Sequence, residues 1–231
     1  MSDPPQTPRA SRFPPVRGPY GVALALSATA ALLMVLVAAG WQPLLDLDGR
    51  IARALHSSAL ERPTWTRTAR VLTDWVWDPW TMRALTAAAV LWLWSRAERT
   101  LAVRIAVAAV SGALAQQVLK AVLGRERPEW ERPVDTAHFA AMPSGHAMTT
   151  AMTCGLLLWA AWQLGSRGPL WWGAAALAVV SSAGVSVTRI YLGVHWLTDV
   201  VAGCLLGGAV AAWAAAHASW RREPRPERIA A

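Results

Sequence analysis

Long blocks of apolar residues constrain this chain more than any other feature. Residues 20–40 carry no charge, and five further blocks follow, at 79–95, 101–123, 143–164, 169–190 and 195–217. A helix of about 20 predominantly apolar residues crosses the roughly 30 Å hydrocarbon core of a bilayer. The sequence therefore predicts an all-α, polytopic membrane protein with six transmembrane helices.

The composition agrees with this interpretation. The chain is 55% hydrophobic and only 16% charged, which is too apolar for an ordinary soluble domain. A signal peptide is the alternative for residues 20–40, but its apolar core would run about 7–15 residues. Cys154 and Cys204 lie inside apolar blocks, so we interpret both as helix-packing residues rather than a disulfide or a metal pair.

Three segments lie outside the predicted spans. Residues 1–18 are rich in Pro, Ser and Arg and are predicted to be a disordered tail, and 218–231 form a basic tail. Residues 41–78 mix charged and apolar residues at near-helical spacing, which predicts one or two amphipathic helices at the membrane interface. The apolar positions of this spacing are Leu44, Leu47, Ile51, Ala54 and Leu55. The expected interface tryptophans are Trp41, Trp65, Trp75, Trp77 and Trp80.

The distribution of arginine predicts the orientation. Six spans place both termini on one side, together with the loops 95–100 and 163–169, and this side holds ten arginines against eight on the other. Basic residues in short loops and tails favour the cytoplasm, so we expect both termini there. The tryptophans expected to form a belt on this inner side are Trp92, Trp94, Trp159, Trp162, Trp171, Trp172, Trp213 and Trp220. The net charge of +8 favours an anionic membrane surface as partner. We do not expect a nucleic acid as partner.

Counting along the spans brings distant polar residues to one membrane face. A helix rises about 1.5 Å per residue, so a span that starts inside near residue 100 reaches the outer face near Lys120, the only lysine of the chain. The next spans place further polar residues at the same level. The converging set is Lys120, Arg127, Ser144, His146, Arg189, His195 and Asp199.

This set suits an anion, and phosphate in particular. Arginine offers a planar fork to phosphate oxygens, lysine a point charge, and the helix start at 143–146 free backbone N–H groups. His146 and His195 add proton transfer or nucleophilic attack, and Asp199 is placed to orient His195. The residues therefore predict phosphoryl transfer at the outer face.

Three motifs carry a family resemblance. They are K-x6-RP (Lys120, Arg127, Pro128), PSGH (143–146) and R-x5-H-x3-D (Arg189, His195, Asp199). In this order and spacing they resemble the signatures of the type 2 phosphatidic acid phosphatase superfamily, which includes vanadium haloperoxidases. The resemblance covers about residues 40–217, with the motifs at 120–199, and implies a membrane phosphatase domain over 19–217.

The resemblance also implies roles for the site residues. His195 would be the nucleophile that forms a phosphohistidine, Asp199 would orient it, and His146 would be the general acid. The phosphate would be bound by Lys120, Arg127, Ser144, Gly145 and Arg189, with no metal and no cofactor. Thr188 stands where the family usually has serine, and because a hydroxyl remains we expect little change.

Several other polar residues receive structural interpretations. Arg125 is interpreted as a solvated loop residue, Gln116 and Gln117 as helix-to-helix hydrogen bonders, and Gly193 as the residue of a tight turn. His138 is expected near the entrance of the site.

Three functions are compatible with these motifs. The first is hydrolysis of a lipid phosphate: phosphatidic acid, phosphatidylglycerol phosphate or a polyprenyl diphosphate. The others are vanadate-dependent halide oxidation and non-enzymatic binding of an anionic lipid or a polyphosphate. The filled catalytic positions argue against the non-enzymatic alternative, and the predicted spans argue against the haloperoxidases, which are soluble. Both arguments favour the lipid phosphatase.

Overall fold

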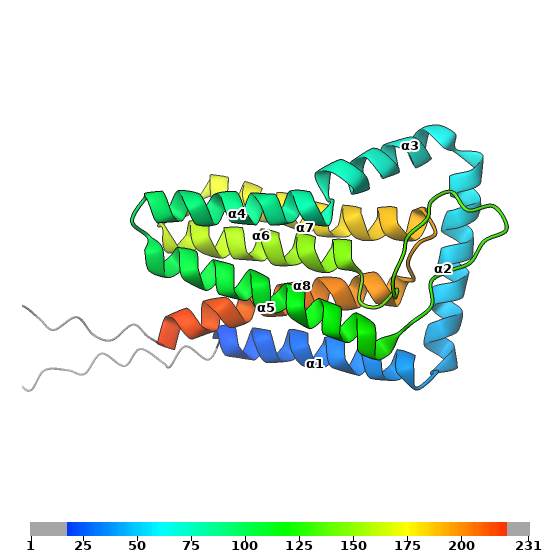
Figure 1. The fold of residues 1–231 in the computed structure, drawn as a ribbon, viewed down its shortest axis with the longest axis horizontal. Coiled ribbons are helices and arrows are strands. Elements are labelled where there is room, and N and C mark those ends of the chain that lie inside the picture. Colours follow the sequence, from blue (N-terminus) through cyan, green and yellow to red (C-terminus); the bar gives the residue numbers. More distant parts are fainter. Residues whose placement is uncertain (1–17, 221–231) are drawn as a thin grey trace, which may run out of the picture.

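Helix α6 (Gly145–Gln163) lies at the centre of a bundle of long helices. It contacts α4 (Pro79–Ser95), α5 (Arg99–Leu123), α7 (Pro169–Tyr191) and α8 (Leu197–Trp220), and α1 (Gly18–Ala38) packs along α8 (Figure 1). The computed structural model describes residues 18–220, without the side chains of Pro19, Ser219 and Trp220. This part of the chain is helical with connecting loops and contains no strand, as predicted. Most of the two predicted tails, 1–18 and 218–231, lies outside the described residues, which exclude 1–17 and 221–231. Gly18 belongs to α1, and residues 218–220 belong to α8.

Four of these helices have the length and hydropathy of membrane spans. They cover Tyr20–Ala38, Arg99–Leu123, Pro169–Tyr191 and Leu197–Ala218. Two shorter helices, α4 and α6, run beside them and coincide with the predicted blocks 79–95 and 143–164. Valines along α5 at 103, 107, 110 and 118 are about half exposed or more, so the side of the bundle presents apolar surface. Such a surface suits hydrocarbon rather than water, and the chain is a membrane protein.

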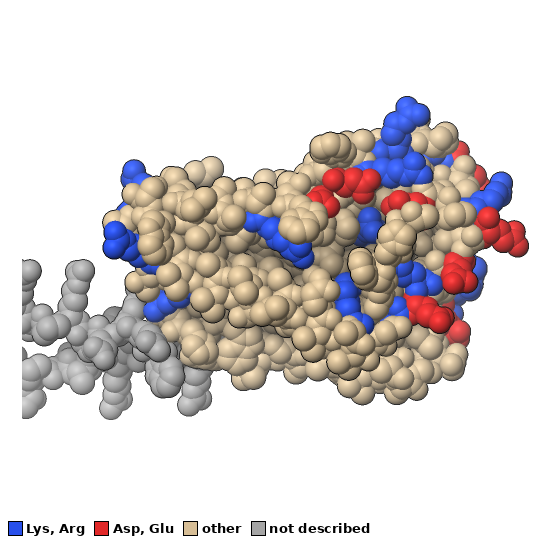
Figure 2. Space-filling model, viewed as in Figure 1, with Lys and Arg blue, Asp and Glu red and all other residues tan. Residues whose placement is uncertain are grey.

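Three consecutive helical segments close one end of the bundle. Helices α2 (Gln42–Glu61) and α3 (Pro63–Val71) are followed by a π-helical turn, Leu72–Val76, and α2 runs across the bundle axis (Figure 1). Charged side chains gather around this end, whereas the middle of the bundle shows few (Figure 2). The two helices confirm the helical interpretation of 41–78.

The buried face of α2 differs from the predicted one. We expected Ala54 on the apolar stripe, but it is exposed, and the buried positions are Asp48, Ala52, His56 and Ala59. The expected stripe is confirmed at Ile51 and Leu55, which are partly buried and pack against the core, and it is wrong at Ala54. The inward face also carries an acidic residue with partners inside the protein. The Asp48 carboxylate accepts hydrogen bonds from the backbone N–H and hydroxyl of Thr198, at 2.9 and 2.6 Å.

Glycines on α8 allow a close approach to α6. A Cβ on Gly207 would lie 2.3 Å from the carbonyl oxygen of Met148, and one on Gly203 would lie 2.8 Å from that of Ser144. These are backbone atoms that cannot move aside easily. The G-x3-G spacing of Gly203 and Gly207 is typical of helix pairs in membranes, where small residues permit backbone contact. The start of α6, with its PSGH motif, is thereby held against α8.

The cysteines have the predicted structural character. Both are free and partly buried, and the Cys204 sulfur lies 3.4 Å from the Ser186 hydroxyl oxygen.

Candidate active site

A cavity of about 420 Å³ lies at the α2 end of the bundle, beside the 124–144 loop. Six of the eight predicted site residues line it: Lys120, Arg127, Gly145, His146, Arg189 and His195. The other two lie directly behind this wall, since Asp199 contacts His195 and Ser144 precedes Gly145 as the N-cap of α6. The structure thus brings together residues from four helices and two loops.

Local backbone geometry places two of these residues. Helix α5 ends at Gly124, whose φ of 55° is left-handed and whose N–H bonds to the Lys120 carbonyl at 3.0 Å. Lys120 is thereby held in the last turn, where its ammonium donates to the Ala140 carbonyl. Gly193 has a φ of 73°, and a Cβ there would lie 2.6 Å from the indole nitrogen of Trp130. This confirms the tight turn that precedes His195.

His195 is held between a carboxylate and a guanidinium. Its Nδ1 lies 3.3 Å from Asp199 Oδ2, and its Nε2 lies 3.1 Å from a terminal nitrogen of Arg127. Arginine can only donate, so Nε2 must be the acceptor and Nδ1 must carry the proton of the neutral ring. The lone pair of Nε2 is therefore on the Arg127 side of the ring, and that side chain lines the cavity with His195.

The electrostatics of the site keep this ring neutral. Burial, together with the positive charges of Arg127, Arg189, Lys120 and Arg125, holds the pKa of His195 well below the usual 6.5. Burial and the neighbouring Arg189 lower the pKa of Arg127 to about 10. The guanidinium therefore remains charged at neutral pH while the imidazole is neutral, with its single proton on Nδ1.

Five buried side-chain polar atoms have no hydrogen-bond partner within the described residues. Three of them belong to His56, Thr73 and Thr150, and the other two are the Ser144 hydroxyl oxygen and the Nε of Arg189. Buried polar groups are normally hydrogen-bonded, so each unpaired one calls for a missing partner. Ser144 and Arg189 belong to the predicted phosphate-binding set, and the start of α6 beside them favours an anion.

Acidic residues line the same cavity and were missed by the sequence reasoning. Asp135 lies 3.8 Å from Arg189, and Asp74 and Asp78 lie nearby in the lining with Arg83. Burial and the charge of Asp135 raise the pKa of Asp74. Asp78 caps α4 through bonds to the N–H groups of Trp80 and Thr81 at 2.7 and 3.2 Å, and the Asp-Pro start of that helix was the available signal.

The interpretation of Arg125 as a solvated loop residue is wrong. Its side chain is only 13% exposed and binds Asp48 at 2.7 Å and Asp199 at 2.6 Å. The prediction for Gln116 is confirmed, because its side-chain nitrogen bonds to the Gly145 carbonyl at 3.3 Å. His138 lines the cavity as expected, from an exposed loop position.

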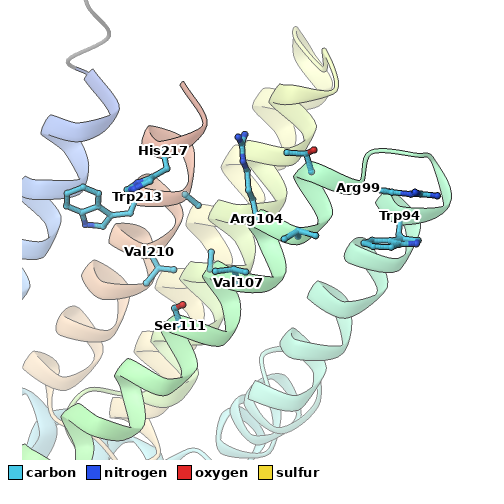
Figure 3. A pocket seen from close by; sticks show the side chains of 12 residues that line it. Trp94, Arg99, Arg104, Val107, Ser111, Val210, Trp213 and His217 are labelled. Atoms are coloured by element: carbon cyan, nitrogen blue, oxygen red, sulfur yellow. The ribbon is translucent and has the colours of Figure 1, made fainter. Parts of the chain in front are cut away.

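A larger cavity of about 770 Å³ lies at the opposite end, between α5 and α8 (Figure 3). Its walls are mainly apolar, with Val103, Val107, Val210 and Trp213, and its charged residues are Arg99 and Arg104. Volume alone would favour this cavity, but the paired histidine and carboxylate lie in the smaller one.

The fold and the site define a helical membrane protein with a cavity lined by cationic side chains next to a histidine–aspartate pair. A family model described as the PAP2 superfamily matches residues 101–223, and the chain belongs to that superfamily.

Two curated relatives are similar in sequence. The putative undecaprenyl-diphosphatase YbjG of Escherichia coli K12 is 32% identical over 125 residues, which cover 52% of this chain and 59% of the relative. The undecaprenyl-diphosphatase of Sulfolobus acidocaldarius is 31% identical over 147 residues, 58% of this chain and 59% of the relative. The chain thus spans somewhat more than half the length of each.

The fold is shared with a solved structure. It is the first transmembrane PAP2 type phosphatidylglycerolphosphate phosphatase from Bacillus subtilis, with a TM-score of 0.76 and 20% identity. The match covers 88% of this chain and 98% of that one.

Proposed function

We propose that this chain is a membrane phosphatase that releases phosphate from a lipid phosphate or diphosphate through a phosphohistidine. The observation that carries the proposal is the cavity in which cationic residues surround a neutral His195 backed by Asp199. The names of the two sequence relatives support a polyprenyl diphosphate as the first substrate to test. Phosphatidic acid and phosphatidylglycerol phosphate are the other two candidates.

In the first step, the Nε2 lone pair of His195 attacks phosphorus, and the bond from phosphorus to the lipid-side oxygen breaks. His146 gives its proton to that leaving oxygen. The phosphorylated ring keeps its Nδ1 proton and becomes cationic, and Asp199 stabilises that charge.

In the second step, water attacks phosphorus, His146 accepts its proton, and the P–N bond breaks to release inorganic phosphate. Lys120, Arg127, Arg189, the Ser144 hydroxyl and the Gly145 N–H would stabilise the charge on the phosphoryl oxygens. In the structure, a terminal nitrogen of Arg127 lies 3.1 Å from Nε2 of His195. The Arg127 guanidinium would therefore have to move from Nε2 to the phosphate oxygens before Nε2 can attack phosphorus.

We also propose that six helices span the membrane, with α4 and α6 as the second and fourth spans. Both chain ends would lie in the cytoplasm and the cavity would face outward, with α2 and α3 as interfacial helices. The start of α1 and the end of α8 lie at the end of the bundle away from α2, in keeping with this orientation (Figure 1). Reporter fusions after residues 127 and 195 must give the same side.

The proposed function is tested by phosphate release from the three candidate lipids in detergent, with excess chelator present. We expect turnover of at least one lipid, undiminished by the chelator, because side-chain cations and backbone N–H donors would stabilise the phosphoryl charge in place of a metal. Binding without turnover of any lipid would instead support a receptor. Halide oxidation after addition of vanadate would support the haloperoxidase alternative.

The role of His146 predicts a dependence on the leaving group. His146→Ala should lower the rate with a lipid alcohol as leaving group by about 100- to 10,000-fold. A 4-nitrophenyl ester needs little protonation of its leaving oxygen, so its phosphoryl transfer to His195 should lose far less. The matched control is His138→Ala, a histidine of the same cavity without an assigned role. Equal losses for both esters in the rate of phosphoryl transfer to His195 would contradict the role of general acid.

A further inference from the structure

A second carboxylate and an arginine stand behind the histidine–aspartate pair. Arg125 binds Asp199 Oδ1 with one terminal nitrogen, at 2.6 Å, and Asp48 Oδ2 with the other, at 2.7 Å. Asp48 lies on α2, 77 residues away in the sequence, and Asp199 lies on α8. The three side chains form a continuous chain of ion pairs that ends at His195.

Every oxygen of these two carboxylates has a partner. Asp199 Oδ2 accepts from the Trp196 N–H at 2.9 Å as well as facing His195, and its Oδ1 is taken by Arg125. Asp48 Oδ1 accepts from the Thr198 N–H, and its Oδ2 from the Thr198 hydroxyl and Arg125. Asp48 and Asp199 are 1% and 0% exposed, so loss of one partner would leave an uncompensated buried charge.

We propose that Asp48 and Arg125 are positioning residues for the nucleophile: Asp48 holds the Arg125 guanidinium, and Arg125 fixes the Asp199 carboxylate against His195. This inference rests on the proposed function of His195. Neither residue is among those that line the cavity, so both act through Asp199. Removal of the outer partners of a metal-bound imidazole typically changes activity by about 10- to 100-fold, and we expect a comparable effect here.

The arrangement also sets the charge behind the imidazole. One cation between two carboxylates leaves one net negative charge, which matches the cationic ring of the phosphohistidine. Removal of Arg125 makes the surroundings of His195 more negative, and removal of the Asp48 charge makes them less negative. Other charged or titratable groups around His195 and its cavity are held constant: Lys120, Arg127, Asp135, His146, Arg189, Asp74, Asp78 and Arg83.

The two substitutions should therefore move the titration of His195 in opposite directions. A unit charge at roughly 6 Å in a partly buried site changes a pKa by about one unit or more. Arg125→Gln should raise the pKa of His195, and Asp48→Asn should lower it by a smaller amount. Activity is lost as pH falls through this pKa. The acid limb of kcat/KM should therefore move to higher pH in Arg125→Gln and to lower pH in Asp48→Asn.

The experiment measures kcat, KM and the acid limb for both variants in the full-length protein. We expect kcat to fall by about 10- to 100-fold in Arg125→Gln with little change in KM. Arg125→Lys keeps the positive charge, so its acid limb should return to the pH of the wild type. Its rate should stay below the wild type, because an ammonium cannot bridge both carboxylates as the planar guanidinium does. The matched controls are Asp46→Asn, an exposed aspartate of α2, and Arg132→Gln, an exposed arginine of the same loop.

A second readout separates this inference from the proposed function. Nitrogen-15 NMR of labelled histidines follows the His195 ring directly, with His195→Ala for assignment. If the wild type turns over no phosphate ester, the proposed function fails, and the NMR shifts still test the positioning role. Shifts in one direction for both variants, or no larger than in the controls, would overturn the inference even if the enzyme is active.

Discussion

His195→Ala is expected to lower phosphate release by at least about 1,000-fold, the largest loss of activity from any single change in this site. The substitution removes the Nε2 lone pair that would form the bond to phosphorus. The side chain that contacts Nε2 is the guanidinium of Arg127, and it cannot replace the nucleophile because it is a cation without a lone pair to share. What remains is electrostatic binding of the phosphate.

The measurement combines steady-state rates with capture of the intermediate. Wild-type protein mixed with a phosphorus-32-labelled lipid and quenched in base should carry label that is stable in base and lost in acid, as expected for a P–N bond. His195→Ala should carry none. His146→Ala given a 4-nitrophenyl ester should retain the label longer, because the attacking water then lacks its base.

His138→Ala is the control for loss of an imidazole from the same cavity, and it should keep a rate close to the wild type. Retention of most activity in His195→Ala would refute the phosphohistidine. Label that persists in this variant would move the nucleophile to another residue.

The sequence predicts the helices and the motif residues well because both signals are local. An apolar block defines a helix from its own composition, and α4 begins and ends at the predicted residues 79 and 95. The positions of Lys120, Arg127 and His195 follow from helix rise and span order. The convergence of seven site residues was predicted from span order, and Gly145 was added by the family resemblance. Their chemical roles stay predictions.

Contacts between distant segments could not be predicted in this way. Arg125 is next to Gly124 and Glu126, and nothing in that local sequence reveals a carboxylate on α2. The pairing of Asp135 with Arg189 is equally non-local, 54 positions apart by residue number. The burial of Asp48 on α2 was missed for the same reason, because a carboxylate is expected at the surface unless its partners are known.

The helix-packing glycines are a different case, because their signal was present but was not used. Gly203 and Gly207 show the G-x3-G spacing inside an apolar block. Gly208 is adjacent and looks equivalent in the sequence. Only the structure separates them: a Cβ on Gly207 would meet α6 backbone atoms at 2.3 and 2.8 Å, whereas one on Gly208 would reach only the end of the Leu26 side chain at 3.4 Å.

Gly207→Ala is therefore expected to destabilise the protein by about 1–3 kcal/mol, the range for an overpacked core, and Gly207→Leu by more. The added carbon must push α6 away from α8 at the Met148 carbonyl, one turn beyond Gly145 and His146. Activity should fall as well, because the displaced segment carries the start of the phosphate site. Thermal unfolding in detergent, followed by tryptophan fluorescence, and phosphate release measure the two effects.

Gly208→Ala is the matched control, with the same added methyl group on the next residue of the same helix. It should be neutral or more stable by up to about 1 kcal/mol, because alanine has the higher helix propensity and the methyl group meets only a flexible side chain. Equal melting temperatures for the two alanine variants would show that α6 and α8 are not in backbone contact at Gly207. The PSGH segment would then have to be positioned by other contacts, such as the bond from the Ser144 N–H to the Asp199 carbonyl at 3.0 Å.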